Sequence, residues 1–186
     1  MIKTAQSECI QKASKIITNG GIIAYPTEGV YGLGCLPEDG NAVFRILNIK
    51  HRDHKKGLII IASDLEQLER WATLNDKELD TITREKKIIT WIVKKNKNVP
   101  YWVSGDHETI AIRLTKHPIA AALCSASKSA LISTSANITG EKPPKNQVML
   151  RRLFGDIVDY IVPGNCNFKI GASTIKILST GKIIRS

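Results

Sequence analysis

Segments in which hydrophobic residues recur at helical spacing alternate along this chain with segments in which they recur at strand spacing. Apolar residues between positions 9 and 17 recur at helical spacing, and Asn19-Gly20 predicts the end of that helix. The apolar run Gly21–Tyr25 predicts a short buried strand, and Asp39 is placed to cap a second helix. The apolar face expected for this second helix consists of Ala42, Val43, Ile46 and Leu47.

The pattern continues through the rest of the sequence. Gly57 precedes the apolar run Leu58–Ala62, which is typical of a strand covered on both faces. A capping box at Ser63 and Glu66 predicts the start of a third helix, Asn75 that of a fourth and Pro118 that of a fifth. A last helix is expected over 148–155, and further strands over 88–93, 109–114, 130–133, 160–162, 174–178 and 182–184. Because strands and helices interleave, the pattern predicts one α/β domain over residues 1–186 with a twisted, largely mixed sheet.

Charge and cysteines add to this picture. Lys and Arg number 27 against 17 Asp and Glu, and the net charge of +10 favours polyanionic partners such as nucleic acid or nucleotide phosphate. A solvated basic surface without a partner is the alternative. The four cysteines form no C-x-x-C pair, as expected for reduced thiols in a cytoplasmic protein. Neither a secretory signal nor an apolar run long enough for a membrane span is found.

The segment Ala24–Gly34, AYPTEGVYGLG, is rich in glycine directly after the first predicted strand. Its spacing, G-x-x-G-x-G, is neither the dinucleotide fingerprint nor a P-loop. Such glycines allow a positive φ or a close approach to something bulky. By itself the segment favours a turn that connects a strand to the next helix over a ligand-binding loop.

The segment Lys50–Lys56, KHRDHKK, is the densest basic cluster. Lys50 and Arg52 alternate, so in an extended conformation both point the same way, and two cations without acidic partners favour phosphate oxygens. A solvated charge run is the alternative. His51 and His54 are not expected to bind a metal, because flanking cations repel the ion and no further ligands are evident.

Small polar residues form another cluster, Ser133–Asn137, after the strand predicted at 130–133. Hydroxyl and amide groups at the carboxyl end of a strand hold ligands in open α/β sheets. A helix cap or Asx-turn is the alternative reading. No G-x-S-x-G elbow surrounds these serines, so a serine hydrolase is not favoured.

Several motifs occur in the order of one known family. The chain resembles the YrdC family, the threonylcarbamoyl-AMP synthases, and its length is similar to that of the short bacterial form. The matching stretches are Tyr25–Gly34, Lys50-x-Arg52 with Lys56-Gly57-Leu58, Ile112-Arg113-Leu114 with His117-Pro118, Ser133–Asn137, Ser173-Thr174 and Arg185. Five motifs and the terminal Arg185, in order across the whole chain, are a specific signal, although each alone is weak.

The resemblance implies a YrdC-type twisted mixed sheet with flanking helices and a concave basic face. It implies that L-threonine, bicarbonate or CO₂, and ATP are joined into threonylcarbamoyl-adenylate with release of pyrophosphate. Partner proteins of the tRNA threonylcarbamoylation pathway would use this product to modify the adenosine beside the anticodon. Mg²⁺ is expected to arrive on the ATP phosphates, with no metal site on the protein itself.

The resemblance also implies roles for eleven residues. The catalytic residues around the triphosphate would be Lys50, Arg52, Ser135 and Asn137. The residues that bind threonine and nucleotide would be Thr27, Tyr31, Lys56, Arg113, Ser133, Ser173 and Arg185. Glu28 is expected to orient its loop rather than to react.

The sequence departs from the family pattern at three places. Arg84–Lys87 replaces a Trp-Pro-Gly-Pro-type turn, Ala172 replaces the usual proline, and Gly29 stands where Thr, Ser or Ala is commoner. The altered turn and the high charge favour one alternative function, a non-catalytic basic RNA-binding module in ribosome or RNA maturation. Basic residues between Lys86 and Lys97 are interleaved with aromatic residues, a pattern that is more often a lysine-rich surface over a buried tryptophan. Together with the net charge they predict weak, salt-sensitive binding of tRNA.

Overall fold

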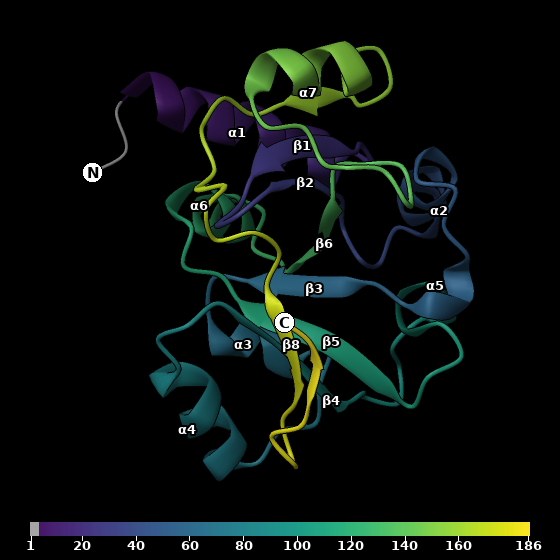
Figure 1. Ribbon diagram of the computed structural model, residues 1–186, viewed down its shortest axis with the longest axis vertical. Helices are drawn as coiled ribbons and strands as arrows, with labels where there is room; N and C mark the ends of the chain where they lie inside the picture. Colours follow the sequence, from purple (N-terminus) through teal and green to yellow (C-terminus); the bar gives the residue numbers. More distant parts are fainter. Residues whose placement is uncertain (1–3) are drawn as a thin grey trace.

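The computed structural model describes residues 4–186, which form one nine-stranded mixed sheet flanked by helices (Figure 1). The strands lie in the order β7-β1-β2-β6-β3-β5-β4-β8-β9. Neighbours in this order are antiparallel except for the pairs β1–β7, β3–β5 and β4–β8. The strand bounds are β1 Ile23–Pro26, β2 Tyr31–Gly34, β3 Ile59–Ala62, β4 Ile89–Lys94, β5 Thr109–Leu114, β6 Leu131–Ser135, β7 Tyr160–Ile161, β8 Thr174–Ile177 and β9 Ile183–Arg185. The α/β class with a mixed sheet is confirmed.

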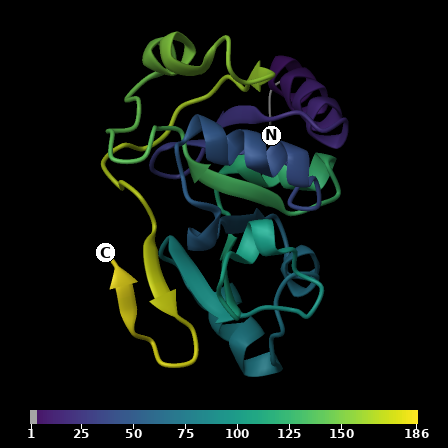
Figure 2. The same cartoon turned by 90° about the vertical axis from the view of Figure 1, so that its right-hand side faces the viewer.

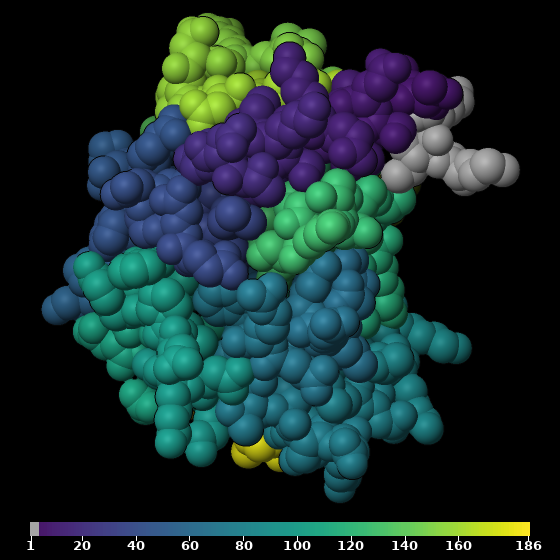
Figure 3. Space-filling model, turned by 180° about the vertical axis from the view of Figure 1, so that it is seen from behind, coloured from purple at the N-terminus to yellow at the C-terminus, as the bar shows by residue number. Residues whose placement is uncertain are grey.

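Helices pack on both faces of the sheet, and the C-terminal hairpin of β8 and β9 forms one of its edges. From behind, α1 and the segments next to it occupy the surface and little of the C-terminal segment is visible (Figure 3), whereas β8 and β9 stand apart in the side view (Figure 2). The helix bounds are α1 Thr4–Thr18, α2 Gly40–Ile49, α3 Leu65–Glu69, α4 Asp76–Arg84, α5 Tyr101–Ser104, α6 Pro118–Ala126 and α7 Gln147–Phe154, with a 3₁₀ turn, η1, at His54–Lys56.

Strand alternation divides the core between the two faces of the sheet. Ile60 and Ile132 belong to the larger cluster, with Trp71 and Trp91, whereas their chain neighbours Ile61 and Leu131 belong to the smaller one. Successive side chains of a strand point to opposite faces, so a strand that is apolar at every position is buried on both. This is the arrangement expected for the apolar run that became β3.

Local capping chemistry decides where several helices begin. Asp39 accepts a hydrogen bond from the backbone of Ala42 at 3.0 Å, and Asn75 forms a reciprocal capping box with Glu78. Pro118 is the first residue of α6. These three predicted helix starts are confirmed, and the four buried residues of α2 are the four expected from its periodicity.

The expected start of α3 is wrong by one residue. Asp64, not Ser63, is the N-cap, and its carboxylate accepts from the backbone of Gln67 at 3.0 Å. A carboxylate at this position attracts the free N–H groups of the first turn more strongly than a hydroxyl. In the last helix, Leu150 and Phe154 are buried, whereas Val148 and Leu153 are exposed.

The glycines of β2 are required for space rather than for backbone conformation. Tyr25 of β1 is paired with Gly32, and its ring lies across the neighbouring strand. A Cβ on Gly34 would lie 2.7 Å from Tyr25 Cε1 and 2.6 Å from the carbonyl oxygen of Ile132. Neither glycine has a positive φ. The glycine-rich segment therefore continues as a strand, which sequence periodicity did not reveal.

Candidate active site

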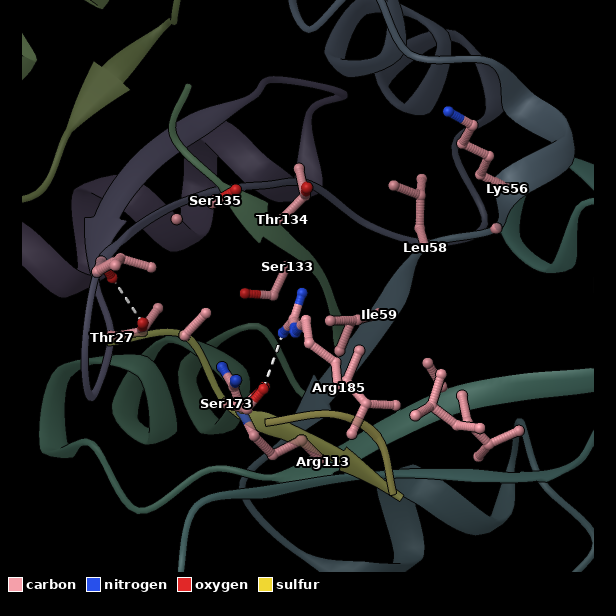
Figure 4. Close-up of a pocket in the computed structure, with 18 of the residues that line it drawn as sticks. Thr27, Lys56, Leu58, Ile59, Arg113, Ser133, Thr134, Ser135, Ser173 and Arg185 are labelled. Carbon is pink, nitrogen blue, oxygen red and sulfur yellow. Dashed lines mark hydrogen bonds between the residues drawn. The ribbon is translucent and has the colours of Figure 1, made fainter. Parts of the chain in front are cut away.

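The sheet has two halves, one formed by β7, β1 and β2 and the other by β3, β5, β4, β8 and β9, with β6 between them. A cavity of about 540 Å³ lies where these two halves meet. It is lined by the β1–β2 loop, the end of α2 and parts of β3, β5, β6, β8 and β9. Figure 4 shows Thr27, Ser133, Ser173 and Arg185 around the same hollow, with Lys56 and Leu58 farther along it. The lining includes ten of the eleven site residues expected from the sequence, namely Thr27, Lys50, Arg52, Lys56, Arg113, Ser133, Ser135, Asn137, Ser173 and Arg185.

Tyr31 is the expected site residue that the structure places outside the cavity lining. Its side chain is fully buried, and its hydroxyl donates to the carbonyl oxygen of Gly164 at 3.0 Å. Period-two alternation in β2 explains this position, because Tyr31 and Leu33 point to the larger core while Gly32 faces the cavity.

Lys50 joins the end of α2 to the loop after β6. Its ammonium group donates to the carbonyl oxygens of Ser135 at 2.5 Å and Asn137 at 2.6 Å, and Asn137 Oδ1 lies 3.4 Å away. The Ser135 hydroxyl donates to the same Oδ1 at 2.5 Å. Burial, followed by repulsion from Arg52, lowers the pKa of Lys50 to about 8. The ammonium group is therefore charged at neutral pH and ties together three of the four predicted catalytic residues.

The backbone between Lys50 and Arg52 is not extended, so the expected reason for their common direction is wrong. Lys50 is helical, with φ −85° and ψ −6°, and His51 has a φ of 47°. The chain is still turning at the end of α2, where the Arg52 N–H donates to the carbonyl oxygen of Leu47 at 2.9 Å. This tight turn nevertheless brings both cations to the cavity.

Arg52 keeps hydrogen-bonding capacity free. Its Nη2 donates to the carbonyl oxygen of Gly57 at 2.9 Å, while its buried Nε has no partner in residues 4–186. Within the same range, no carboxylate forms an ion pair with Arg52 or Lys50. A buried charged donor without a protein partner indicates an anionic ligand.

Arg113 is held by Glu28, with Arg113 Nη2 and Glu28 Oε2 3.4 Å apart. Glu28 Oε1 also accepts from the Thr115 hydroxyl at 2.7 Å and the Lys116 N–H at 3.0 Å. Burial alone would raise the pKa of Glu28, but Arg113 and these hydrogen bonds together outweigh it, and the pKa is lowered. Glu28 is thus an ionised carboxylate that is paired with Arg113 and hydrogen-bonded through Oε1, and it is a poor proton acceptor. Thr115 is not among the site residues predicted from the sequence, although a hydroxyl-bearing residue directly after Ile112-Arg113-Leu114 could have indicated it.

Arg185 and Ser173 complete the site from β9 and from the residue before β8. Arg185 Nη2 donates to the carbonyl oxygen of Ser173 at 2.8 Å (Figure 4). The hydroxyl groups of Ser173 and Thr90 lie 2.7 Å apart. Burial and then repulsion from Arg113 lower the pKa of Arg185, and burial and then Arg185 lower that of Arg52. Five cationic side chains of the described residues therefore line one cavity, namely Lys50, Arg52, Lys56, Arg113 and Arg185, and Glu28 balances the charge of Arg113.

Comparisons with known proteins agree with this geometry. The Sua5/YciO/YrdC family model, whose description reads "Telomere recombination", matches residues 15–186. The chain belongs to this family. Threonylcarbamoyl-AMP synthase of Nitrosococcus oceani is 41% identical over 182 residues, covering 95% of this chain and 96% of that protein. The synthase of Coxiella burnetii is 41% identical over 184 residues, covering 96% and 97%. The family expected from the sequence is confirmed.

Solved structures of the family share the fold. The crystal structure of P. abyssi Sua5 complexed with L-threonine superposes with a TM-score of 0.85 at 33% identity. It covers 94% of this chain, which spans about half of that protein, 52% of its length. E. coli YciO superposes with a TM-score of 0.81 at 26% identity and covers 97% of this chain and 89% of its own.

Two further observations concern membranes and metals. None of the helices within residues 4–186 has both the length and the apolar character that crossing a membrane requires. Over the same residues, no three His, Cys, Asp or Glu side chains converge as a candidate metal site.

Proposed function

We propose that the chain is a nucleotidyltransferase that makes threonylcarbamoyl-adenylate from L-threonine, bicarbonate or CO₂, and ATP. Full-length relatives at about 40% identity bear the name of this activity. The observation that carries the proposal is the convergence of Lys50, Arg52, Arg113 and Arg185 on one cavity. Within residues 4–186, the buried Nε atoms of Arg52 and Arg113 have no hydrogen-bond partner. The product serves the threonylcarbamoyladenosine modification of tRNA, through partner proteins that take it up.

The chemistry asks for charge stabilisation more than for a base. Once threonine's amine has taken up CO₂ and lost a proton, one carbamate oxygen is an anionic nucleophile. This oxygen forms a bond to the α-phosphorus of ATP, and the bond from that phosphorus to the β-phosphate oxygen breaks. Pyrophosphate leaves with the electron pair. Two anions must meet and a third must leave, which positioned cations favour.

Each cation has a place in this scheme. Lys50 and Arg52, with Ser135 and Asn137 beside them, bind the triphosphate and stabilise the leaving pyrophosphate. Thr27, Ser133 and Arg113 bind threonine, and Ser173, Lys56 and Arg185 bind the nucleotide. Mg²⁺ enters with ATP as part of the substrate, held by phosphate oxygens. A cavity of about 540 Å³ lies within the range, roughly 300–1,000 Å³, of small-molecule sites.

Pyrophosphate release tests the proposal. The purified chain is incubated with ATP, Mg²⁺ and bicarbonate, with and without L-threonine, and mass spectrometry follows the adenylate. Threonine-dependent pyrophosphate together with a threonylcarbamoyl-adenylate mass is expected. Folded protein that releases none would leave the non-catalytic RNA-binding module as the function.

A further inference from the structure

A strap, residues 163–172, crosses between the two halves of the sheet beside the cavity. It runs from the end of β7 to the start of β8, and Figure 2 shows this connection descending along one side of the molecule. Its last residues, Gly171 and Ala172, line the cavity next to Ser173. The strap therefore supplies one wall of the site.

The beginning of the strap is fixed at Gly164. Its carbonyl oxygen accepts two hydrogen bonds of 3.0 Å, one from the Tyr31 hydroxyl and one from Gln147 Nε2. A Cβ at this glycine would lie 2.4 Å from Ile119 Cδ1 and 2.8 Å from Pro26 Cγ. The backbone is thus pressed against its neighbours, and Tyr31 contributes a buried donor at that point.

His117 fixes the next residue. Its Nε2 lies 3.2 Å from the carbonyl oxygen of Asn165. Because a carbonyl oxygen only accepts, Nε2 carries the proton. Burial lowers the pKa of His117 although the hydrogen bond to Asn165 opposes this, so the ring is neutral and Nδ1 is unprotonated. His117 is not part of the cavity lining and acts on it only through the strap.

The strap then lies directly on the loop that carries Thr27 and Glu28. The Asn167 N–H donates to the carbonyl oxygen of Glu28 at 3.0 Å. A Cβ on Gly29 would lie only 1.7 Å from the carbonyl oxygen of Gly171, so the contact requires glycine at position 29. The strap position and the position of the Thr27 loop are therefore coupled.

After its last anchor, at Asn167, the strap exposes much of its side-chain surface. Phe168 is 38% exposed and Ile170 46%. Gly171 has a φ of 72°, and no atom of the described residues lies within 4 Å of an ideal Cβ there. The Phe168 ring rests on Tyr31, with centroids 5.7 Å apart. The position of Gly171 and Ala172 consequently depends on the anchors at Gly164, Asn165 and Asn167 before them and on Ser173, which Arg185 holds, after them.

We propose that Tyr31 and His117 are positioning residues for L-threonine: they hold the strap against the Thr27 loop and thereby set the width of the amino-acid end of the cavity. The inference rests on the proposed function, which puts threonine beside Thr27 and the triphosphate beside Lys50 and Arg52. Misplacing this wall weakens binding of the small amino acid and leaves the phosphate contacts intact. Steady-state constants of variants thus separate this role from a general structural one.

Tyr31→Phe is the sharpest test, because it removes one hydroxyl and keeps the ring against Phe168. Threonine binding is measured by calorimetry in the presence of α,β-methylene-ATP, and KM values for threonine and ATP by pyrophosphate release. We expect the Kd and the KM for threonine to rise about threefold to tenfold, which is the range for the loss of one neutral hydrogen bond. The KM for ATP and kcat should not change. Tyr101→Phe, which removes a hydroxyl from an exposed ring outside the strap and the cavity lining, serves as the control.

His117→Ala is expected to act in the same direction, and His117→Gln, which restores a side-chain N–H, to recover threonine affinity in part. A threonine Kd equal to that of the unaltered chain in both Tyr31→Phe and His117→Ala overturns the inference, as does an equal rise in both KM values. Hydrogen exchange of residues 164–172 provides a measurement that does not depend on turnover. It should be faster in the variants if the anchors hold the strap. Failure of the unaltered chain to release pyrophosphate would instead contradict the proposed function.

Discussion

Lys50 and Asn137 are 87 residues apart in the sequence, yet the Lys50 ammonium group donates to the Asn137 carbonyl oxygen at 2.6 Å and lies 3.4 Å from its side-chain oxygen. The lysine is 3% exposed, so these acceptors take the place of water around its charge. Lys50 therefore serves two purposes. It holds the loop after β6 against α2, and it offers a positive charge to the cavity.

Substitutions of Lys50 and Arg52, at the end of α2, are expected to separate an effect on stability from an effect on catalysis. Arg52→Ala removes a partly unpartnered guanidinium, and adenylate formation should fall by roughly two to three orders of magnitude with little change in stability, by analogy with loss of an oxyanion donor. Lys50→Met should lower the rate similarly and also the free energy of unfolding, by about 1–3 kcal/mol, because buried acceptors lose their donor.

Pyrophosphate release and urea unfolding measure the two effects. Lys55→Ala, at an exposed lysine of the same segment that does not line the cavity, is the matched control. Near-normal turnover in both Arg52→Ala and Lys50→Met would show that the cluster is only a solvated surface.

The pH dependence of Lys50 is expected to move stability and activity in opposite directions. Its pKa in the folded chain, about 8, is below the ordinary value of 10.5, so between these values the unfolded chain binds more protons. The contribution of Lys50 to the free energy of unfolding therefore rises with pH in that window. The kcat/KM for ATP should fall above pH 8, as the ammonium group that meets phosphate is lost.

Lys50→Arg provides the comparison, because arginine keeps its charge throughout this range. Urea midpoints and kcat/KM are measured from pH 7 to about 10 on both proteins. If the alkaline fall in kcat/KM is the same in the variant, Lys50 is not its cause.

Glu28→Gln is expected to destabilise the chain by several kcal/mol, about 3–5 for a broken buried ion pair, because Arg113 is left without its counter-charge. The folded-state pKa of Glu28 is lowered, so the carboxylate stabilises the fold above its unfolded pKa and ceases to do so as pH falls through the folded value. The difference between the two proteins should therefore shrink in acid.

Denaturant unfolding at pH 7 and pH 3.5 measures this difference. Glu108→Gln is the matched control, since Glu108 is 95% exposed at its side chain and lies 3.6 Å from Lys95. Such exposed pairs contribute about 1 kcal/mol or less. Equal effects of the two substitutions would contradict a structural role for the Glu28–Arg113 pair.

RNA binding is expected to be electrostatic and unselective. The net charge of +10 and the exposed lysines 86, 87, 94 and 97 predict weak binding of tRNA that falls steeply with salt, because counterion release drives it. A filter-binding titration compares tRNA with an unrelated structured RNA over a range of salt. Lys94→Glu with Lys97→Glu should weaken both without changing pyrophosphate release. Salt-resistant, tRNA-selective binding would instead indicate a dedicated RNA site.

Features that depend on neighbouring residues could be predicted from the sequence. Asp39, Asn75 and Pro118 start helices through bonds or dihedral preferences within one turn, so local sequence suffices. Motifs likewise identified ten residues that the fold brings to one cavity. Their roles there remain predictions.

Features that depend on distant partners could not be predicted. The glycine at position 34 is explained by the Tyr25 ring on the adjacent strand. The family resemblance implies a pocket position for Tyr31, and the sequence pattern did not predict the strand that turns this side chain to the core. The approach of Gly29 to Gly171 joins segments 142 residues apart, and no local pattern encodes it. The strap's role accordingly became visible only in three dimensions.

Strand β6 pairs with β2 on one side and β3 on the other, so it joins the two halves of the sheet, and it also carries Ser133 and Ser135. Contacts of such long sequence separation form only after large loops have closed, at a considerable entropic cost. During refolding, the catalytic cavity therefore arises together with the completed sheet and not before it. A partly folded chain whose two half-sheets have not yet joined has helices and strands but no site for ATP. Recovery of turnover is therefore a measure of completed folding.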